Sequence, residues 1–314
     1  MRNIIKLFPV FAGICWGGSG IFVRVLYGAG LENMTIIFSR LLVTVGIMAI
    51  WIFCTDRSLF KVSKRDLPLL VLSGILGYFM MNACYNVAIH TLSLSLAAVL
   101  LCTAPVYVII FGAIVFKEKI TPLKIICMVA VFFGCVLLSG VVETGALQWS
   151  VTGIAFGIAC SICNAICTMG CNEASGVRGL HPATVLFYNS LFAMIPAIPF
   201  VKPAAITGMI ADGPAFAIFI LVMNALMSSL LPNLFFNISF KYMESGIVSI
   251  LASGAEPTAA LIFGIVLYHE VPTFIGFIGM VVVITSIIIL TASKQKQKIR
   301  VQEPQKTPEG GDIK

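Results

Sequence analysis

Long apolar stretches separated by short polar turns make up most of the chain. Residues 67–116 contain no Asp, Glu, Lys or Arg, and this stretch alone is long enough for two helices that cross a bilayer. Because lipid cannot hydrogen-bond the backbone, such stretches form helices or closed barrels. Barrel strands alternate polar and apolar residues over about ten positions, and these stretches do not. The pattern predicts an all-α integral membrane protein.

Turn residues divide the apolar stretches into ten expected transmembrane helices. We place them at 5–26, 35–54, 67–89, 93–116, 121–140, 151–170, 181–200, 215–238, 246–268 and 272–292. Lys and Arg collect on the cytoplasmic side of membrane proteins. With the N-terminus inside, the inner segments hold Arg2, Lys6, Arg57, Lys61, Lys64, Arg65, Lys117, Lys119, Lys124, Arg178, Lys241, Lys294, Lys296, Lys298, Arg300, Lys306 and Lys314. The outer loops hold only Lys202. This separation predicts a multi-pass protein of the cell membrane with both termini in the cytoplasm.

Composition points to the same class. Hydrophobic residues make up 59% of the chain and charged residues 11%, and the mean hydropathy is +1.04. A soluble domain carries about 25% charged residues, so this surface must face a lipid bilayer. The net charge of +7 suits anionic headgroups and not nucleic acid. Residues 294–314 cannot bury apolar surface, and we expect them to form a disordered cytoplasmic tail.

The chain also matches itself when it is shifted by 152 residues, which aligns 97–121 with 249–273 without a gap. The matched positions are Pro105 with Pro257, Phe111 with Phe263, Gly112 with Gly264, Glu118 with Glu270 and Thr121 with Thr273. A proline inside each helix and a glutamate at each helix end are harder to obtain by chance than apolar identities. The match therefore predicts an internal repeat.

The repeat unit is five helices, with residues 1–144 as the first unit and 145–293 as the second. Because five is odd, the second unit enters the membrane upside down relative to the first. Inverted repeats place a substrate site near the midplane between the halves and let the halves move for alternating access. The expected fold is therefore two inverted five-helix repeats that serve transport.

Four segments carry a family resemblance over residues 5–293: Trp16-Gly17-Gly18-Ser19, Phe38-Ser39-Arg40-Leu41-Leu42, and the two Pro-to-Glu segments. Together with the ten helices they resemble the EamA family of the drug/metabolite transporter superfamily. The resemblance implies a ten-helix bundle with a central cavity that exports metabolites such as amino acids. The first helix has no acidic residue, unlike the small multidrug-resistance relatives, so their drug–proton mechanism is not carried over.

Glu256 is the only acid expected near the centre of a helix, and Ser249 and Ser253 share its face. A charge inside the bilayer costs at least about 2.5 kcal/mol. Its carboxyl could exchange a coupling proton or hold a substrate ammonium. A hydrogen-bonded carboxyl that only joins helices is the structural alternative.

Three other charged positions need a reason as well. Arg40 lies about 8 Å from the outer surface at 1.5 Å per residue. Its side chain could reach the headgroups, bind an anionic substrate group or pair with an acid. Glu118 and Glu270 sit symmetrically at helix ends, where local hydrogen bonds or gate contacts are the two interpretations.

Neutral polar residues that share one face of a helix are weaker evidence for a substrate site. Interhelical hydrogen bonds are common in membranes without any transport role. The residues that we consider for substrate binding are Trp16, Tyr78, Asn82, Tyr85 and Asn164. Trp16 and Tyr78 could offer aromatic faces to a flat organic substrate. Pro105 and Pro257 either break their helices and free carbonyls for a substrate, or kink the helices for packing.

Other function classes lack their motifs. Zinc-protease chemistry needs His-Glu-x-x-His, but Thr273 stands where the second His should follow His269-Glu270. No Gly-Lys pair offers a P-loop. Four cysteines of the sixth helix, Cys160 to Cys171, extend over about 16 Å and cannot converge on one ion. We expect no enzyme, cofactor or metal site, but a secondary transporter of a small organic molecule, with a proton as the candidate coupling ion. A scramblase, a sensor or a membrane enzyme is the alternative, and the oligomeric state stays open.

Overall fold

The computed structural model describes residues 2–92, 94–139, 150–269 and 273–292. In these ranges every regular element is a helix, and nine helical segments are long and apolar enough to cross a membrane. They are Phe8–Gly28, Asn33–Thr55, Leu67–Thr91, Leu96–Val115, Val151–Val177, Pro182–Phe200, Pro214–Ser239, Ser245–Leu267 and Phe274–Ala292. A tenth, shorter apolar helix covers Pro122–Leu138. The all-α class with ten membrane helices is confirmed.

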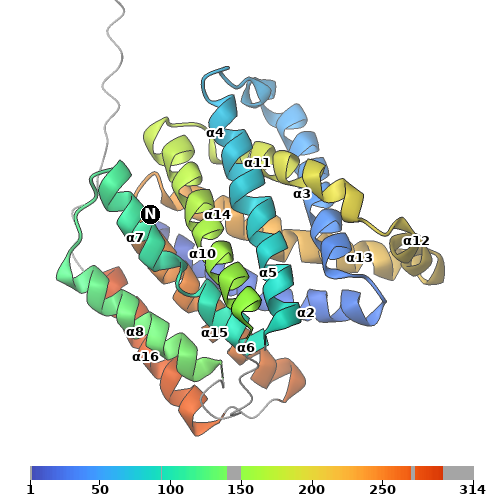
Figure 1. The fold of residues 1–314 in the computed structure, drawn as a ribbon. Coiled ribbons are helices and arrows are strands. Elements are labelled where there is room, and N and C mark those ends of the chain that lie inside the picture. Colours follow the sequence, from blue (N-terminus) through green and yellow to red (C-terminus); the bar gives the residue numbers. More distant parts are fainter. Residues whose placement is uncertain (1, 93, 140–149, 270–272, 293–314) are drawn as a thin grey trace, which may run out of the picture.

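Figure 1 labels the longer elements in chain order. The first five segments are α2 (Phe8–Gly28), α3 (Asn33–Thr55), α4 (Leu67–Leu72) with η2 (Ser73–Phe79) and α5 (Met80–Thr91), α6 (Leu94–Leu101) with α7 (Ala104–Val115), and α8 (Pro122–Leu138). The last five are α10 (Val151–Cys171) with η3 (Asn172–Val177), α11 (Pro182–Ala197) with η4 (Ile198–Phe200), α13 (Pro214–Ala225) with η5 (Leu226–Leu230) and α14 (Leu231–Ser239), α15 (Ser245–Tyr268), and α16 (Phe274–Ala292). Short helices outside these segments are α1 (Arg2–Ile5), η1 (Arg57–Phe60) and α12 (Pro203–Asp212).

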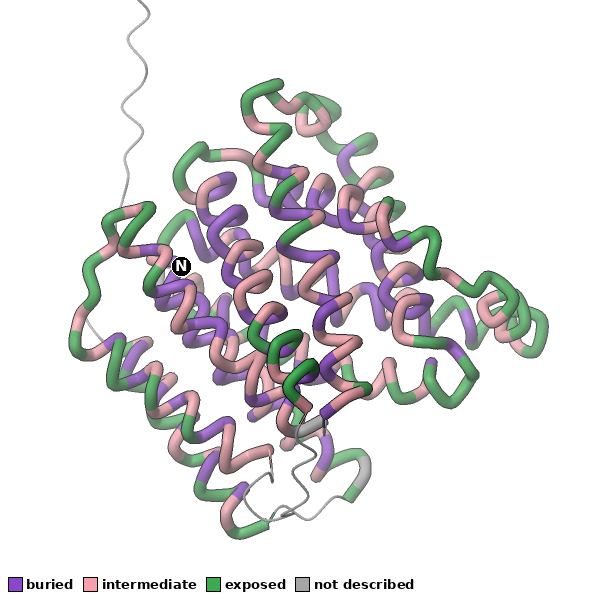
Figure 2. Tube along the Cα trace, in the orientation of Figure 1, coloured by how far each residue is buried: buried purple, intermediate pink, exposed green. Residues whose placement is uncertain are grey.

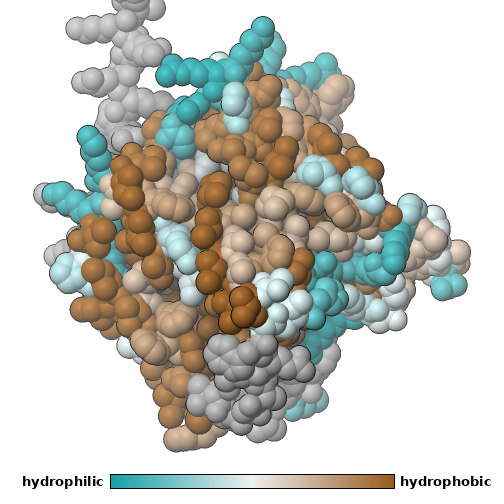
Figure 3. All heavy atoms as spheres, in the orientation of Figure 1, coloured by the Kyte–Doolittle hydropathy of each residue, from teal (hydrophilic) through white to brown (hydrophobic). Residues whose placement is uncertain are grey.

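The outside of the bundle is apolar and its interior contains polar groups. Large hydrophobic side chains such as Ile50, Ile114 and Phe274 are exposed, and hydrophobic residues cover much of the face in Figure 3. Buried positions gather in the middle of the bundle in Figure 2, and Asn224 and Ser229 are among them. A water-soluble protein arranges these residue types the other way round. The distribution therefore fits a bundle surrounded by lipid.

Helices α2 and α15 make the most extensive contact between two helices of the described chain. The contact is close because Gly13 and Gly17, four residues apart on α2, face the backbone of α15. A Cβ added at Gly13 would lie 2.6 Å from the Cβ of Ala255 and 3.0 Å from the backbone nitrogen of Glu256. Small residues at this spacing let two membrane helices approach closely. The glycines thus fix the middle of α15, where Glu256 lies.

The contacts between helices recur when each helix is replaced by its counterpart in the other half, as a two-unit repeat predicts. Corresponding elements are α2 and α10, α3 and α11, α4–α5 and α13–α14, α6–α7 and α15, and α8 and α16. Helix α2 contacts α15 and α14, and its counterpart α10 contacts α7 and α5. Helices α8 and α16 pair with each other at one edge of the bundle (Figure 1). This pattern supports the proposed units 1–144 and 145–293, whose boundary lies outside the described residues.

Two further backbone features recur at the 152-residue shift. The π-helical segment η2 begins at Ser73 and its counterpart η5 begins at Leu226, one residue from the position that the shift gives. Lys117 and His269 are the two non-glycine residues with positive φ in the described chain, and both have φ 53°. These residues are 152 positions apart, so the same local geometry ends the corresponding helices α7 and α15.

The two prolines of the repeat, which were expected either to break or to kink their helices, behave differently. The backbone leaves the helix between Leu101 and Ala104, so Pro105 begins α7 after a break. Pro257 lies inside the continuous helix α15. Proline has no N–H for the carbonyl of Ser253, and the Cys135 thiol donates to that carbonyl instead, at 3.9 Å.

Candidate functional site

Glu256 lies at the twelfth position of α15, far from both ends of the helix. Among the described residues its carboxylate has no hydrogen-bond or ion-pair partner. The residue is partly accessible. Tyr85 of α5, Cys102 between α6 and α7, and Cys160 of α10 lie within range of an electrostatic interaction with it. Glu256 is therefore surrounded by both halves of the chain.

A carboxylate in this position needs a partner. Burying an uncompensated charge is costly, and protein charges inside membranes pair with other groups or face water. Ser249 is buried on the same helix face and Ser253 is partly accessible, and neither bonds to Glu256. The described contacts therefore include no hydrogen bond of Glu256 that joins helices. Its role as a proton or ligand site stays a prediction.

Arg40 lies on α3 and points to α5. Its Nη2 donates to Oδ1 of Asn82 at 2.8 Å, and Asn82 donates in turn to the carbonyl of Tyr78 at 2.7 Å. The Arg40 Nε is buried without a partner, and no carboxylate of the described residues forms an ion pair with Arg40. The hydrogen bond holds the guanidinium against Asn82, which is buried inside the bundle. Of the three interpretations, pairing with an acid is not seen.

Tyr78 joins the π-helical segments η2 and η5. Its hydroxyl lies 3.1 Å from Oγ of Ser229 in η5, and Nδ2 of Asn233 donates to it at 3.4 Å. Nearby, Nε1 of Trp16 donates to the carbonyl of Ser228 at 3.2 Å, and its ring contacts Phe236 edge-on. The polar ends of both aromatic residues are thus occupied by links between helices. π-helical segments occur often at functional sites.

Asn164 of α10 and Tyr85 of α5 are two further polar residues of the bundle interior. Both are partly accessible, and neither has a hydrogen-bond partner among the described residues. Asn164 lies one turn after Cys160 on α10, and Tyr85 lies three residues after Asn82 on α5. We call Arg40, Asn82, Tyr85, Asn164 and Glu256 the central polar site. It presents one cation, one anion and neutral hydrogen-bonding groups.

Ser161 and the break before Pro105 have a packing role. The Ser161 Oγ donates to the carbonyl of Leu100 at 2.5 Å, and the Thr103 hydroxyl donates to the same carbonyl at 2.6 Å. The carbonyl of Leu100, next to the helix break, is therefore used inside the protein. Whether the break frees another carbonyl for a substrate stays a prediction.

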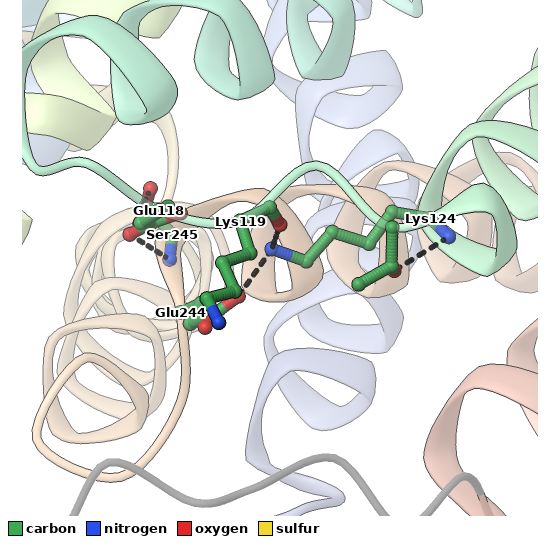
Figure 4. A network of polar contacts seen from close by, with 6 residues as sticks. Glu118, Lys119, Lys124, Glu244 and Ser245 are labelled. Carbon is green, nitrogen blue, oxygen red and sulfur yellow. Dashed lines mark hydrogen bonds and ion pairs between the residues drawn. The ribbon is translucent and has the colours of Figure 1, made fainter.

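Glu118 caps the start of α15. Its Oε1 accepts from the backbone N–H of Ser245 at 3.0 Å and from the Ser245 hydroxyl at 2.9 Å (Figure 4). Gly112 leaves room for this carboxylate, because a Cβ there would lie 3.0 Å from it. Of the two interpretations, local hydrogen bonding is the one seen. Glu270, its counterpart, lies outside the described residues, as does the tail 294–314.

The sequence did not reveal a buried ion pair beside this cap. Lys124 at the start of α8 is buried, and its Nζ bonds to Oε2 of Glu244 and to the Lys119 carbonyl (Figure 4). Lys124 counted only as a loop cation in the charge pattern. Its partner is 120 residues away in the other half, and no spacing in the sequence links the two.

The ends of the helices carry further ion pairs. Arg178 after η3 contacts Asp66 at 2.8 Å and Glu173 at 2.9 Å. Hydrogen bonds to Asp66 and then to Glu173 raise the pKa of Arg178, so its charge is retained. No group of three or more His, Cys, Asp or Glu that could hold a metal is found in the described ranges.

Comparisons with known proteins agree with this architecture. The model of the EamA-like transporter family matches residues 4–140 and 151–292. A protein of Bacillus subtilis (strain 168), named as the uncharacterized transporter YxxF, is 23% identical over 99% of this chain and 94% of its own length. An uncharacterized transporter of Archaeoglobus fulgidus is 26% identical over 45% of this chain and 48% of its own length.

A solved structure titled "Crystal structure of protein" superposes with a TM-score of 0.75. It is 13% identical in sequence, and the match covers 93% of this chain and 97% of that one. This likeness concerns the fold alone. The family model matches once on each side of the expected boundary, over nearly all of both halves. The chain belongs to the EamA-like transporter family, and it is a multi-pass membrane protein of a transporter family.

Proposed function

We propose that the protein is a secondary transporter of small organic metabolites, amino-acid-like solutes in particular, and that it exports them by alternating access. The observation that carries this proposal is Glu256, a partly accessible residue between the two halves whose carboxylate has no partner among the residues that the structure describes. Repeat-built transporters bind their substrates at this depth between their halves. The basic residues support an orientation with both termini in the cytoplasm.

A proton is the coupling ion that the site favours. Glu256 is the one acid in the middle of a described helix, and it can hold either a proton or a substrate ammonium. An ammonium ligand fits a carboxylate that forms no ion pair with any described residue. The same carboxylate could serve both roles in turn, so that release of the substrate permits protonation.

Purified protein in sealed vesicles tests this proposal. We expect uptake of one or more labelled amino acids without ATP, and a response to an imposed pH gradient. Glu256→Gln keeps the shape of the side chain but cannot titrate, so as a proton carrier it should retain binding and lose the pH response. As an ammonium ligand it should lose binding itself. Glu32→Gln, which removes an exposed outer carboxylate, is the matched control.

Two outcomes would contradict the proposal. Normal uptake and a normal pH response in the Glu256→Gln protein would remove this residue from the mechanism. Movement of labelled lipids between leaflets, without uptake of any solute, would instead indicate a scramblase.

A further inference from the structure

The central polar site contains two opposite charges that do not pair with each other. Arg40 has a buried Nε without a partner, and Glu256 has no partner at all in the described chain. A desolvated charge is tolerated when another charge compensates it. If both residues only supported the fold, pairing them directly would compensate both. Their separation leaves each of them available to a ligand of the opposite charge.

Helix α5 carries a group that interacts with each of the two charges. Asn82 accepts the hydrogen bond from Arg40, and Tyr85 lies within electrostatic range of Glu256. Residues three apart lie on the same face of a helix, about 4.5 Å apart along its axis. The α5 residues that interact with the cation and with the anion therefore lie on one face, at neighbouring turns.

The chemistry of Arg40 specifies the ligand group. A guanidinium is planar, stays charged and binds a carboxylate through two parallel N–H groups. Asn82 holds one edge of the Arg40 guanidinium in place, while the Nε–H remains unused. A carboxylate on the substrate would satisfy that N–H and neutralise the charge. An ammonium on the same substrate would neutralise Glu256.

We propose that Arg40 is a specificity-determining residue that binds the carboxylate of a zwitterionic substrate, while Glu256 binds its ammonium. The proposal rests on the proposed transport function and deepens it. It states that both charged ends of the substrate are needed. Molecules that carry only one of them would leave Arg40 or Glu256 uncompensated.

Inhibition of uptake in sealed vesicles tests the assignment. The probes are leucine, threonine and phenylalanine, each with its amide, which lacks the carboxylate, and its deaminated acid, which lacks the ammonium. The native protein should prefer the amino acid to both analogues. Loss of a charge-assisted hydrogen bond should weaken binding about 10- to 100-fold. Arg40→Gln should therefore weaken binding of the amino acid by this factor and leave the amide unchanged.

Two further variants complete the design. Glu256→Gln should show the reverse pattern and lose the discrimination against the deaminated acid. Arg40→Lys keeps the charge without the planar fork, so it should give an intermediate preference. Equal weakening of the amino acid and the amide in Arg40→Gln would overturn the assignment. Equal preference of the native protein for the amino acid and its amide would overturn it too, with the transport function intact.

A second inference rests on the ion pair between Lys124 and Glu244. The 152-residue shift places Leu92 opposite Glu244 and Gly276 opposite Lys124. The corresponding end of the molecule therefore cannot form this pair. We infer that the buried pair holds the 117–121 end of the bundle closed, and that the asymmetry biases the protein toward the state that is open at the other end.

Thiol labelling from each side of oriented vesicles measures this bias. The protein carries Glu256→Cys, with its ten native cysteines replaced. We expect labelling mainly from the side opposite the 117–121 loop. Lys124→Met with Glu244→Gln removes both charges, which preserves folding better than removing one of them. This double variant should raise labelling from the loop side several-fold.

The exposed pair of Lys202 and Glu32 supplies the matched control. Lys202→Met with Glu32→Gln should leave the ratio of labelling from the two sides unchanged. An unchanged ratio in the folded Lys124 and Glu244 double variant would overturn the inference. So would the same increase in the control.

Discussion

The contact between α2 and α15 makes a sharp prediction about two glycines of one helix. A Cβ added at Gly17 would lie 2.8 Å from the backbone nitrogen of Ala260 and 2.9 Å from the Cβ of Ala259, and it would also meet the carbonyl of Glu256. Gly20, one turn further along α2, has nothing within 4 Å of an added Cβ. Gly17→Ala and Gly20→Ala are therefore the same chemical change in two different environments.

The two environments set the expected magnitudes. Replacing glycine by alanine inside a helix gains about 1 kcal/mol of helix propensity. Overpacking a tight contact costs about 1 to 3 kcal/mol. At Gly17 most of the opposing atoms belong to the backbone, which cannot rotate away, so the whole helix must move. Gly20→Ala should stabilise the protein by up to about 1 kcal/mol, and Gly17→Ala should be less stable than Gly20→Ala by about 1 to 3 kcal/mol.

Equilibrium unfolding in mixed detergent micelles measures this difference. Transport should fall in the Gly17→Ala protein even at temperatures where it stays folded, because the displaced backbone carries Glu256. Equal unfolding free energies of the two variants would refute the contact. Full activity in a destabilised Gly17→Ala protein would refute its link to the central polar site.

Three shorter predictions follow from the helix ends. Glu118→Ala removes the cap of α15 and should lower the unfolding free energy by about 1 kcal/mol. Burial and the nearby Lys241 charge lower the pKa of His181, so stability should fall as the pH drops from about 7.5 to about 5.5. Calorimetry should show a weaker fall in His181→Asn, which keeps a cap acceptor. In a protein without native cysteines, an impermeant thiol reagent applied to intact cells should label Gln148→Cys but not Ser63→Cys, and the reverse would contradict the ten-helix orientation.

The ten helices could be predicted from the sequence because lipid imposes one dominant rule. An uncharged stretch of sufficient length must become a helix, so the described segments begin and end within several residues of their expected bounds. The family resemblance was confirmed for the same reason, since it rests on spans and their positions. Glu256 was also identifiable, because a charge in the middle of such a helix is conspicuous.

Features that depend on contacts between distant segments could not be predicted. The π-helical segments η2 and η5 carry no separate residue signal, and a proline alone does not tell the break before Pro105 from the continuous helix around Pro257. Arg40 had three interpretations until the hydrogen bond to Asn82 fixed its direction. Each of these outcomes is decided by what the neighbouring helix offers at that depth.

The central claim is that water and solutes reach Glu256 between the two halves, and accessibility of this position tests it most directly. The protein carries Glu256→Cys after replacement of its ten cysteines, and Ile262→Cys, at an exposed apolar position of the same helix, is the control. A charged, impermeant thiol reagent should modify Glu256→Cys in membranes and should leave Ile262→Cys unmodified. Failure to label Glu256→Cys from either side of the membrane, in a folded protein, would contradict the account.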